Sequence, residues 1–136
     1  MATFDLELVS PERLLLSRPV EMAVIPAYEG EMGVLPGHSP MIVALRGGVI
    51  RVTEGGRETE SLFIMGGFAE ITPARMTVLA DEATPLASLS RAAAAQRVTE
   101  AEAALAAAAN DAPEIRERAN DRLMAARAMQ DAAQAA

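Results

Sequence analysis

The sequence changes character within residues 84–95, TPLASLSRAAAA. All nine glycines and seven of the eight prolines lie at or before Pro85, whereas 21 of the residues in 86–136 are alanine. Glycine and proline mark the turns between short strands, and alanine favours the helix. We therefore predict a β domain over residues 1–85 that is followed by a helical segment over residues 86–136.

The part before Pro85 alternates apolar and polar residues with the period of a β-strand. The apolar residues at positions 4, 6 and 8 are predicted to face one way, and those at positions 20, 22 and 24 continue the pattern. Gly55 and Gly56 can supply the positive φ angles that a tight hairpin requires. Many short strands at close spacing predict an antiparallel β-sandwich or a flattened barrel. Because aromatic residues make up only 3% of the chain, its core is expected to be aliphatic.

The part after Pro85 is predicted to form two helices, over about residues 88–109 and 112–133. Ser88 is the expected N-cap of the first helix, and Asp111 with Glu114 has the spacing of a capping box for the second. Pro113 falls in the first turn of the second helix, where its missing N–H costs nothing. Because the connection is short, the helices are expected to form an antiparallel hairpin, and the predicted fold class is α+β.

Both helices have thin apolar faces that consist largely of alanine. Alanine buries little area, whereas a large apolar side chain contributes roughly 1.5–3 kcal/mol when it is fully buried. The hairpin is therefore expected to be intrinsically helical but weakly docked. Two alternatives stay open, a mobile pair of helices that serves as a switch and a fixed coiled-coil arm.

The composition excludes several classes of protein. A net charge of −7 argues against nucleic-acid binding, which needs a basic surface. The chain has no cysteine, which rules out disulfides, thiolate catalysis and cysteine-based zinc sites. No apolar run approaches the roughly 20 residues of a membrane span, and the N-terminus lacks the pattern of a signal peptide. We expect a cytoplasmic protein that contacts a membrane only through its partners.

The densest feature is the stretch of residues 29–40, EGEMGVLPGHSP, which predicts a rigid, non-repetitive loop. It is not a phosphate-binding P-loop, since it lacks the Gly-Lys-Ser/Thr ending. Glu29, Glu31 and His38 are a weak pattern for a metal site, and no nucleophile or oxyanion donor accompanies them. We therefore expect no metal, no cofactor and no catalytic site. The loop is expected to be a recognition surface, because a stiff loop loses little entropy on docking; the alternative is a shaped turn with solvated charges.

Three further blocks follow this stretch: LRGGVIRV at 45–52, GGFAEI at 66–71 and TVLADEA at 77–83. In their order and spacing, the four blocks resemble the ATP synthase epsilon family. The resemblance covers nearly the whole β domain, while the helical part is similar in architecture only. It implies a β-sandwich followed by a helical hairpin, in a non-catalytic central-stalk subunit of the rotor of a proton-translocating F-type ATP synthase.

The resemblance also implies partners and a location. The expected partners are the gamma subunit, the membrane rotor ring of c subunits, and the alpha and beta subunits of the catalytic head. The expected place is the cytoplasmic face of the bacterial inner membrane, with membrane contact only through the complex. Glu29, Glu31 and His38 would form the interface with the ring and gamma, with Glu31 facing the ring and His38 near gamma.

The second helix is implied to extend toward the catalytic head and to block ATP hydrolysis. Arg116, Arg118, Arg122 and Arg127 lie on this helix and are the residues expected to meet an acidic segment of the catalytic subunits. Exposed ion pairs are typically worth under about 1 kcal/mol each. The alternative is that these arginines form a solvated helix face.

One motif departs from the family pattern. Many bacterial members carry Leu/Ile-Asp-x-x-Arg-Ala at the start of the first helix and use it to bind ATP, whereas this chain has LSRAAA at residues 89–94. Ser90 stands in place of the aspartate, and Ala93 stands in place of the arginine. We therefore expect no nucleotide-binding site.

A function of a different class is also open, a free-standing β-sandwich binding module with a helical dimerisation arm. The scarcity of aromatic residues disfavours a small-molecule pocket, which such side chains usually line. An enzyme is not expected, because no catalytic constellation is present. Co-purification discriminates the two remaining classes, since a stalk subunit is expected to purify with gamma and a binding module alone or as a homodimer.

Overall fold

A computed structural model of the chain describes residues 2–135. Within these residues, ten strands precede one short 3-10 turn and two α-helices. The strands are β1 (Phe4–Val9), β2 (Leu14–Val20), β3 (Met22–Ala27), β4 (Gly30–Val34), β5 (Met41–Leu45), β6 (Gly48–Glu54), β7 (Arg57–Ile64), β8 (Gly67–Ile71), β9 (Arg75–Ala80) and β10 (Ala83–Pro85). The turn η1 is Leu86–Ser88, and the helices are α1 (Arg91–Ala107) and α2 (Pro113–Ala135).

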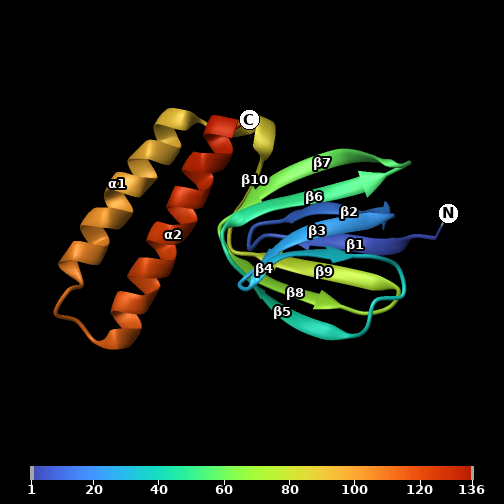
Figure 1. Cartoon of the computed structure of the whole chain (residues 1–136), viewed down its shortest axis with the longest axis horizontal. Coiled ribbons are helices and arrows are strands. Elements are labelled where there is room, and N and C mark those ends of the chain that lie inside the picture. Colours follow the sequence, from blue (N-terminus) through green and yellow to red (C-terminus); the bar gives the residue numbers. More distant parts are fainter. Residues whose placement is uncertain (1, 136) are drawn as a thin grey trace.

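The strands form one sheet that folds over itself into two layers. The order is β10-β7-β6-β3-β5-β8-β9-β1-β2, and β4 pairs with β3 beside this path. Every pairing is antiparallel except that of β1 with β9, which is parallel. Figure 1 shows the resulting sandwich, with the two helices against one of its ends. The predicted fold class, a β-sandwich followed by a helical hairpin, is confirmed.

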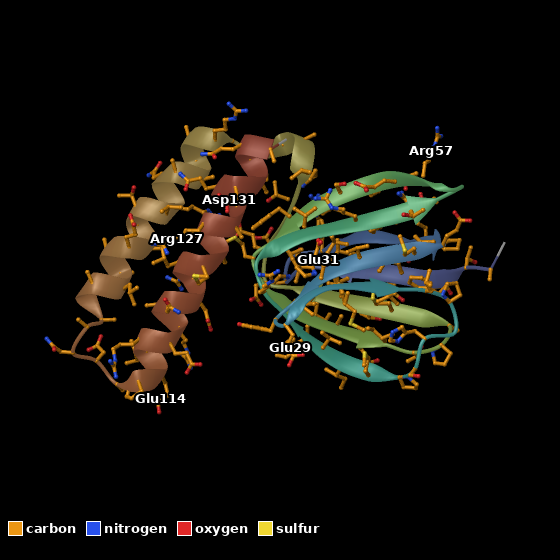
Figure 2. All side chains as sticks on the ribbon, in the orientation of Figure 1. Glu29, Glu31, Arg57, Glu114, Arg127 and Asp131 are labelled. Atoms are coloured by element: carbon orange, nitrogen blue, oxygen red, sulfur yellow. The ribbon has the colours of Figure 1, made fainter. Side chains whose placement is uncertain are left out.

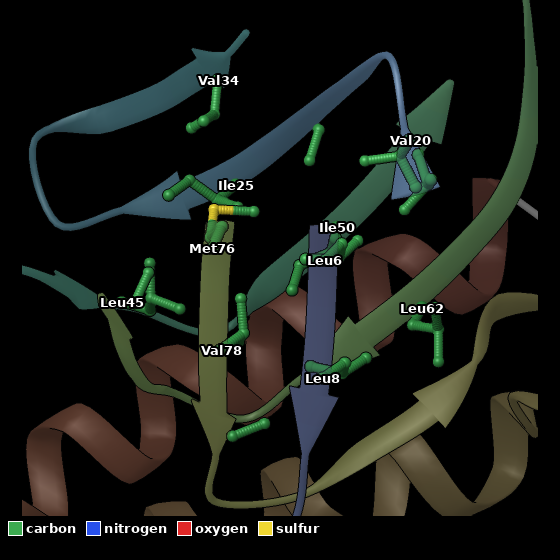
Figure 3. Close-up of a cluster of buried hydrophobic side chains, with 14 of the residues drawn as sticks. Leu6, Leu8, Val20, Ile25, Val34, Leu45, Ile50, Leu62, Met76 and Val78 are labelled. Carbon is green, nitrogen blue, oxygen red and sulfur yellow. The ribbon is translucent and has the colours of Figure 1, made fainter. Parts of the chain in front are cut away.

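An aliphatic core fills the space between the two layers (Figure 3). Leu6 and Leu8 are buried while Asp5 is exposed, as the alternation in this strand predicts. Side chains from both layers meet here, and the largest that are fully buried in this cluster are Leu6, Leu8, Ile25, Leu45, Ile50, Ile64, Ile71 and Met76. The expectation of an aliphatic core is confirmed, since Phe4 is the one aromatic member of this cluster among the described residues.

The pattern predicted for residues 20–24 is wrong after its first residue. Val20 and Ala23 are buried, whereas Met22 and Val24 are only half-buried. The cause is Glu21, which interrupts the chain between β2 and β3 and donates its backbone N–H to the Thr53 carbonyl oxygen at 3.0 Å. Because side chains alternate with a period of two, one interrupting residue moves the following apolar set to the other face.

The stretch 29–40, predicted as a non-repetitive loop, is a loop only in its second half. Residues Gly30–Val34 form β4, which pairs antiparallel with β3. Gly30 makes this hairpin possible, because its φ of 137° is one that other residues rarely adopt. Gly55 and Gly56, with φ angles of 61° and 78°, form the hairpin turn predicted between β6 and β7.

The helix ends differ from the predicted ones in detail. Ser88 lies in the turn η1, and the N-cap of α1 is Ser90, whose side chain accepts a hydrogen bond from the Ala93 N–H at 3.2 Å. Pro113 is the first residue of α2, so the residue before the helix is Ala112 and not the predicted cap, Asp111. Pro113 itself lies in the first turn, as predicted.

The hairpin is docked against the sandwich in this structure. Figure 1 shows α2 next to the sandwich and α1 on its outer side. Phe63 of β7 is buried under the helices, in a cluster with Ala94 of α1 and with Met129 and Ala133 of α2. A second cluster around Leu123 joins the two helices to each other. Few large side chains take part, and the strength of this docking stays a prediction.

Candidate functional site

Glu29 and Glu31 lie on the β3–β4 hairpin, and both side chains are exposed. Figure 2 places Glu29 at the end of this hairpin, on the side of the sandwich that faces the helices. Glu31 lies on β4, in register with Pro26 of β3. The hairpin therefore presents two carboxylates to solvent from a hydrogen-bonded, rigid support.

His38 lies beyond the other end of β4, in the loop of residues 35–40. Its Nδ1 lies 3.0 Å from the Ser39 carbonyl oxygen, and the loop is tied to the sandwich by the Gly37 N–H, which donates to the Pro73 carbonyl oxygen at 2.8 Å. A strand of five residues spans about 16 Å. The three predicted interface residues thus lie at two separate places on the sandwich, two on the β3–β4 hairpin and one in the next loop.

No metal site is formed by these side chains. Among residues 2–135, no group of three or more His, Cys, Asp or Glu residues is arranged to hold a metal ion. The same part of the chain contains no helix that is long and apolar enough to cross a membrane.

A row of apolar side chains crosses one end of the outer face of the layer that contains β5, β8, β9, β1 and β2, whereas Glu7, Glu70, Arg75 and Thr77 occupy outward positions beyond it. Phe68 of β8 is 56% exposed and lies in register with Leu79 of β9, which is 55% exposed, and with Ala44 of β5. The register continues from Leu79 to Val9 of β1 and from there to Leu14 of β2. We call this surface the outer apolar face; it consists of Val9, Leu14, Ile42, Ala44, Phe68 and Leu79.

The outer apolar face was not predicted from the sequence. The core-facing residues of β8 and β9 are Ala69, Ile71, Met76, Val78 and Ala80, and the outward residues between them include Phe68 and Leu79. One sequence signal could have indicated this face. In VLA at 78–80, three apolar residues follow one another, so the middle one, Leu79, must point away from the core if its two neighbours point into it. Contiguous apolar patches on a soluble domain commonly mark a protein interface.

The four arginines of α2 do not form one patch. Arg116 and Arg127 are eleven residues apart, which places them within about 20° of each other around the helix. Arg118, Arg122 and Arg127 line the groove between the hairpin and the sandwich, whereas Arg116 is not among the residues that line it. Arg127 is paired with Glu102 of α1 at 3.7 Å, between two side chains that are about half exposed.

The groove between the hairpin and the end of the sandwich has a volume of about 1110 Å³. Apolar side chains of Tyr28, Met65, Phe68 and Met124 line it together with charged residues of both signs. At its edge, Arg97 of α1 makes a two-pronged ion pair with Glu82, in which Nη1 donates to Oε2 at 3.1 Å. This pair ties the first helix to the segment that leads out of the sandwich.

Tyr28 lies at the end of the β3–β4 hairpin and lines the groove together with Asp121 of α2. Burial raises the pKa of the Tyr28 phenol, and the nearby Asp121 carboxylate raises it further through its charge and as a hydrogen-bond partner. The turn that carries Glu29 therefore lies across the groove from α2.

One further contact joins the hairpin to the sandwich, and another joins its two helices to each other. A Cβ on Gly47, in the β5–β6 loop, would lie 2.7 Å from the Ala125 Cα of α2, so the loop and the helix are in backbone contact. The Arg91 guanidinium donates to the carbonyl oxygens of Ala133 and Gln134, each at 3.4 Å, in the last turn of α2. The sequence analysis found neither contact, because nothing in a local pattern shows which loop an alanine-rich helix will touch.

The comparisons with known proteins point to one family. The sequence profile described as "ATP synthase, Delta/Epsilon chain, beta-sandwich domain" matches residues 3–86. A protein of Granulibacter bethesdensis named "ATP synthase epsilon chain" is 54% identical over 133 residues, which cover 98% of each chain. A protein of the same name from Rhodospirillum rubrum is 49% identical over 110 residues, 81% of this chain and 82% of the relative.

Solved structures share the same fold. A chain in the cryo-EM structure of the Euglena gracilis mitochondrial ATP synthase, described as OSCP/F1/c-ring, is 27% identical with a TM-score of 0.76. The match covers 97% of this chain and 82% of that one. A chain in the central stalk and c-ring of the Tetrahymena thermophila mitochondrial ATP synthase has a TM-score of 0.67 at 10% identity, over 96% of both chains, which is a likeness of fold.

Proposed function

The chain belongs to the ATP synthase delta/epsilon family, as a non-catalytic subunit of the rotor, and from this premise we propose which of its surfaces make which contacts. As a subunit of ATP synthase it is part of a membrane-associated complex. The proposed role is to join the gamma subunit to the membrane rotor ring of c subunits. The proposed place is the cytoplasmic face of the bacterial inner membrane, with the proton as the coupling ion.

The outer apolar face is the observation that carries this proposal. It is supported by the hydrogen bonds of five strands, and the helical hairpin leaves Phe68 and Leu79 about half exposed. A rigid apolar surface loses little entropy when a partner covers it. We assign it to the gamma subunit. His38 fits this assignment, because its loop leads directly into β5, whose residue Ile42 belongs to the face.

The β3–β4 hairpin is the surface that we assign to the rotor ring. Glu29 and Glu31 are exposed on it, and the end of the hairpin lies at the end of the sandwich that bears the helices, where the Tyr28 N–H donates to the Ala44 carbonyl oxygen at 3.2 Å. Two carboxylates on a hydrogen-bonded support suit polar loops that offer hydrogen-bond donors. Each such contact at an exposed site is weak, so its expected role is to fix orientation more than to supply affinity.

The helical hairpin is the element that we assign to the control of ATP hydrolysis. In the docked state, Arg118 and Arg122 line the groove against the sandwich, and Arg127 is paired with Glu102. These exposed side chains are proposed to meet acidic segments of the alpha and beta subunits once α2 leaves the groove and extends toward them. The docked structure is thus proposed to be the state that permits hydrolysis, and the undocked state the one that restrains it.

Co-purification of the full-length chain with the other subunits tests the proposal. We expect one copy of the chain to purify with gamma, and this pair to bind the detergent-solubilised rotor ring. A chain that purifies as a free homodimer and binds neither partner would support the alternative, a free-standing binding module with a helical dimerisation arm. Chain stoichiometry by light scattering separates the two results.

A further inference from the structure

We propose that the β3–β4 hairpin couples the rotor-ring contact to the docking of the helices, with Tyr28 and Gly47 as the positioning residues. The inference rests on the proposed function, since it takes Glu31 as a contact of the ring. It adds a regulatory link: a change at the ring alters the fraction of hairpins that are docked, and undocking alters the ring contact.

The end of the β3–β4 hairpin and the β5–β6 loop are bonded into one unit. The Tyr28 N–H donates to the Ala44 carbonyl oxygen at 3.2 Å, and the Arg46 N–H donates to the Pro26 carbonyl oxygen at 2.9 Å. Ala27 and Leu45 are paired between these two hydrogen bonds. We call this unit, residues 26–29 and 44–48, the platform.

The platform touches α2 without side chains in between. A Cβ on Gly48 would lie 2.6 Å from the Cβ of Pro26, so the two halves of the platform are packed as closely as their backbones allow. A Cβ on Gly47 would lie 2.7 Å from the Cα of Ala125, so the platform meets the helix in the same way. Because packed interiors are close to rigid, a displacement of one partner at such contacts is passed to the other.

Tyr28 adds a second connection across the groove. Its side chain and Asp121 of α2 both line the groove, and the Asp121 carboxylate adds to the burial that raises the pKa of the Tyr28 phenol. Tyr28 is adjacent in sequence to Glu29, and its backbone is fixed in the platform. The turn faces α2 across the groove, so we expect the orientation of the turn and the position of the helix to depend on each other.

A short chain of contacts therefore leads from the proposed ring contact to the helix. Glu31 is in register with Pro26, Pro26 is bonded to Arg46 and packed against Gly48, and Gly47 touches Ala125. The docked and undocked positions of the hairpin are the two states that this chain of contacts can bias. Because coupling is reciprocal, ring binding should change the docked fraction, and a change in docking should change the affinity for the ring. Either quantity can therefore be measured to test the inference.

The test uses the full-length chain in reconstituted ATP synthase. Because the chain has no cysteine, Arg57→Cys and Ala103→Cys introduce two spin labels, one at the far end of the sandwich and one on α1. The distance distribution between them gives the docked fraction. Affinity for the detergent-solubilised ring is measured separately on the same variants, and melting temperatures show that each variant is folded.

Two substitutions probe the coupling from opposite ends. Glu31→Ala is expected to lower the affinity for the ring and to change the docked fraction in the complex, whereas Glu58→Ala, which removes an exposed carboxylate on β7, changes neither. Tyr28→Phe removes only the hydroxyl and leaves both ring-facing carboxylates in place. It is expected to lower the ratio of docked to undocked hairpins about threefold in the free chain, and to change ring affinity by up to the same factor, according to how much of each state is populated.

The outcomes separate the two claims. If Glu31→Ala leaves the affinity for the ring unchanged, the assignment of Glu31 to the ring contact is wrong, and the proposed coupling through that contact is wrong too. If Glu31→Ala weakens ring binding but the docked fraction stays as in the unmodified complex, the ring contact stands and the coupling alone is overturned. Tyr28→Phe overturns the coupling too, if it changes docking in the free chain while ring affinity stays constant.

Discussion

Gly47 in the β5–β6 loop and Ala125 in α2 are in backbone contact, and only a glycine fits at the first of these positions. A Cβ on Gly47 would lie 2.7 Å from the Cα of Ala125 and 2.8 Å from its Cβ, distances that real Cβ atoms essentially never show. Backbone atoms cannot move aside as the end of a flexible side chain can. This contact therefore ties the position of the helical hairpin to the identity of one residue in the sandwich.

Gly47→Ala is predicted to undock the hairpin while the sandwich stays folded. The added methyl group needs α2 to move away, and overpacking of this kind costs about 1–3 kcal/mol, which lowers the ratio of docked to undocked molecules by about fivefold or more. Gly33→Ala is the matched control, because a Cβ there meets nothing within 4 Å. Limited trypsin digestion at the arginines of α2 reports the change. Equal digestion rates for the two variants contradict the steric argument.

The domain division stays a prediction, and truncation tests it. A chain of residues 1–85 keeps β10, which pairs with β7, but it loses the helices that cover Phe63. We predict that it melts cooperatively and is less stable than the full chain by roughly the 1.5–3 kcal/mol that burial of one large apolar side chain contributes. Circular dichroism at increasing temperature measures this. A truncated chain without a cooperative transition would show that the sandwich depends on the helices.

Glu31→Ala and His38→Ala are predicted to change the free energy of unfolding by no more than about ±0.5 kcal/mol. Glu31 is exposed, and the ring of His38 contacts only the adjacent Ser39 carbonyl oxygen among the hydrogen bonds of the described residues. The coupling of ATP turnover to proton flow is expected to decrease instead. Urea denaturation of the free subunit and proton pumping by the reconstituted complex give the two values. If a variant unfolds the free subunit but leaves the coupling of ATP turnover to proton flow unchanged, the assignment of these residues to an interface is wrong.

Binding of ATP to the free subunit is predicted to be weaker than micromolar. The Ser90 hydroxyl caps α1, Arg91 is directed to the carbonyl oxygens at the end of α2, and Arg97 is paired with Glu82. The loss of two charge-assisted hydrogen bonds, at roughly 1.5–3 kcal/mol each, weakens binding by about two to four orders of magnitude.

Isothermal titration calorimetry measures this affinity. The double variant Ser90→Asp with Ala93→Arg restores the family motif at two exposed positions, and it is expected to bind ATP more tightly than the unmodified chain. Micromolar affinity of the unmodified chain would show that other residues replace the motif.

The order of the elements could be predicted because its causes are local. Gly55 and Gly56 adopt positive φ angles wherever the rest of the chain lies, and the alternation from Phe4 to Leu8 marks one buried face without reference to a partner strand. The composition change at Pro85 separates strands from helices in the same way. The fold class that depended on these local causes is confirmed, whereas Ser88 and Asp111, which local spacing also predicted as caps, do not cap the helices.

The rest depends on contacts between residues far apart in the sequence. Glu21 shifts the alternation of β3 because its N–H bonds to Thr53, and β4 exists because β3 lies beside it. Phe68 belongs to an apolar surface only once Leu79 is paired with it. The docking of α2 depends on a glycine in a distant loop, which no periodicity in the helix can indicate.

The affinity of the chain for the gamma subunit, compared between two apolar-to-acidic variants, tests the central claim most directly. Phe68→Asp places a charge in the outer apolar face, whereas Ile115→Asp places one at a half-exposed position of α2, away from that face. Since loss of an aromatic anchor at an interface costs about 2 kcal/mol or more, we predict that Phe68→Asp weakens gamma binding at least about 30-fold, while Ile115→Asp leaves it unchanged. A folded Phe68→Asp variant that binds gamma as tightly as the unmodified chain would contradict the account.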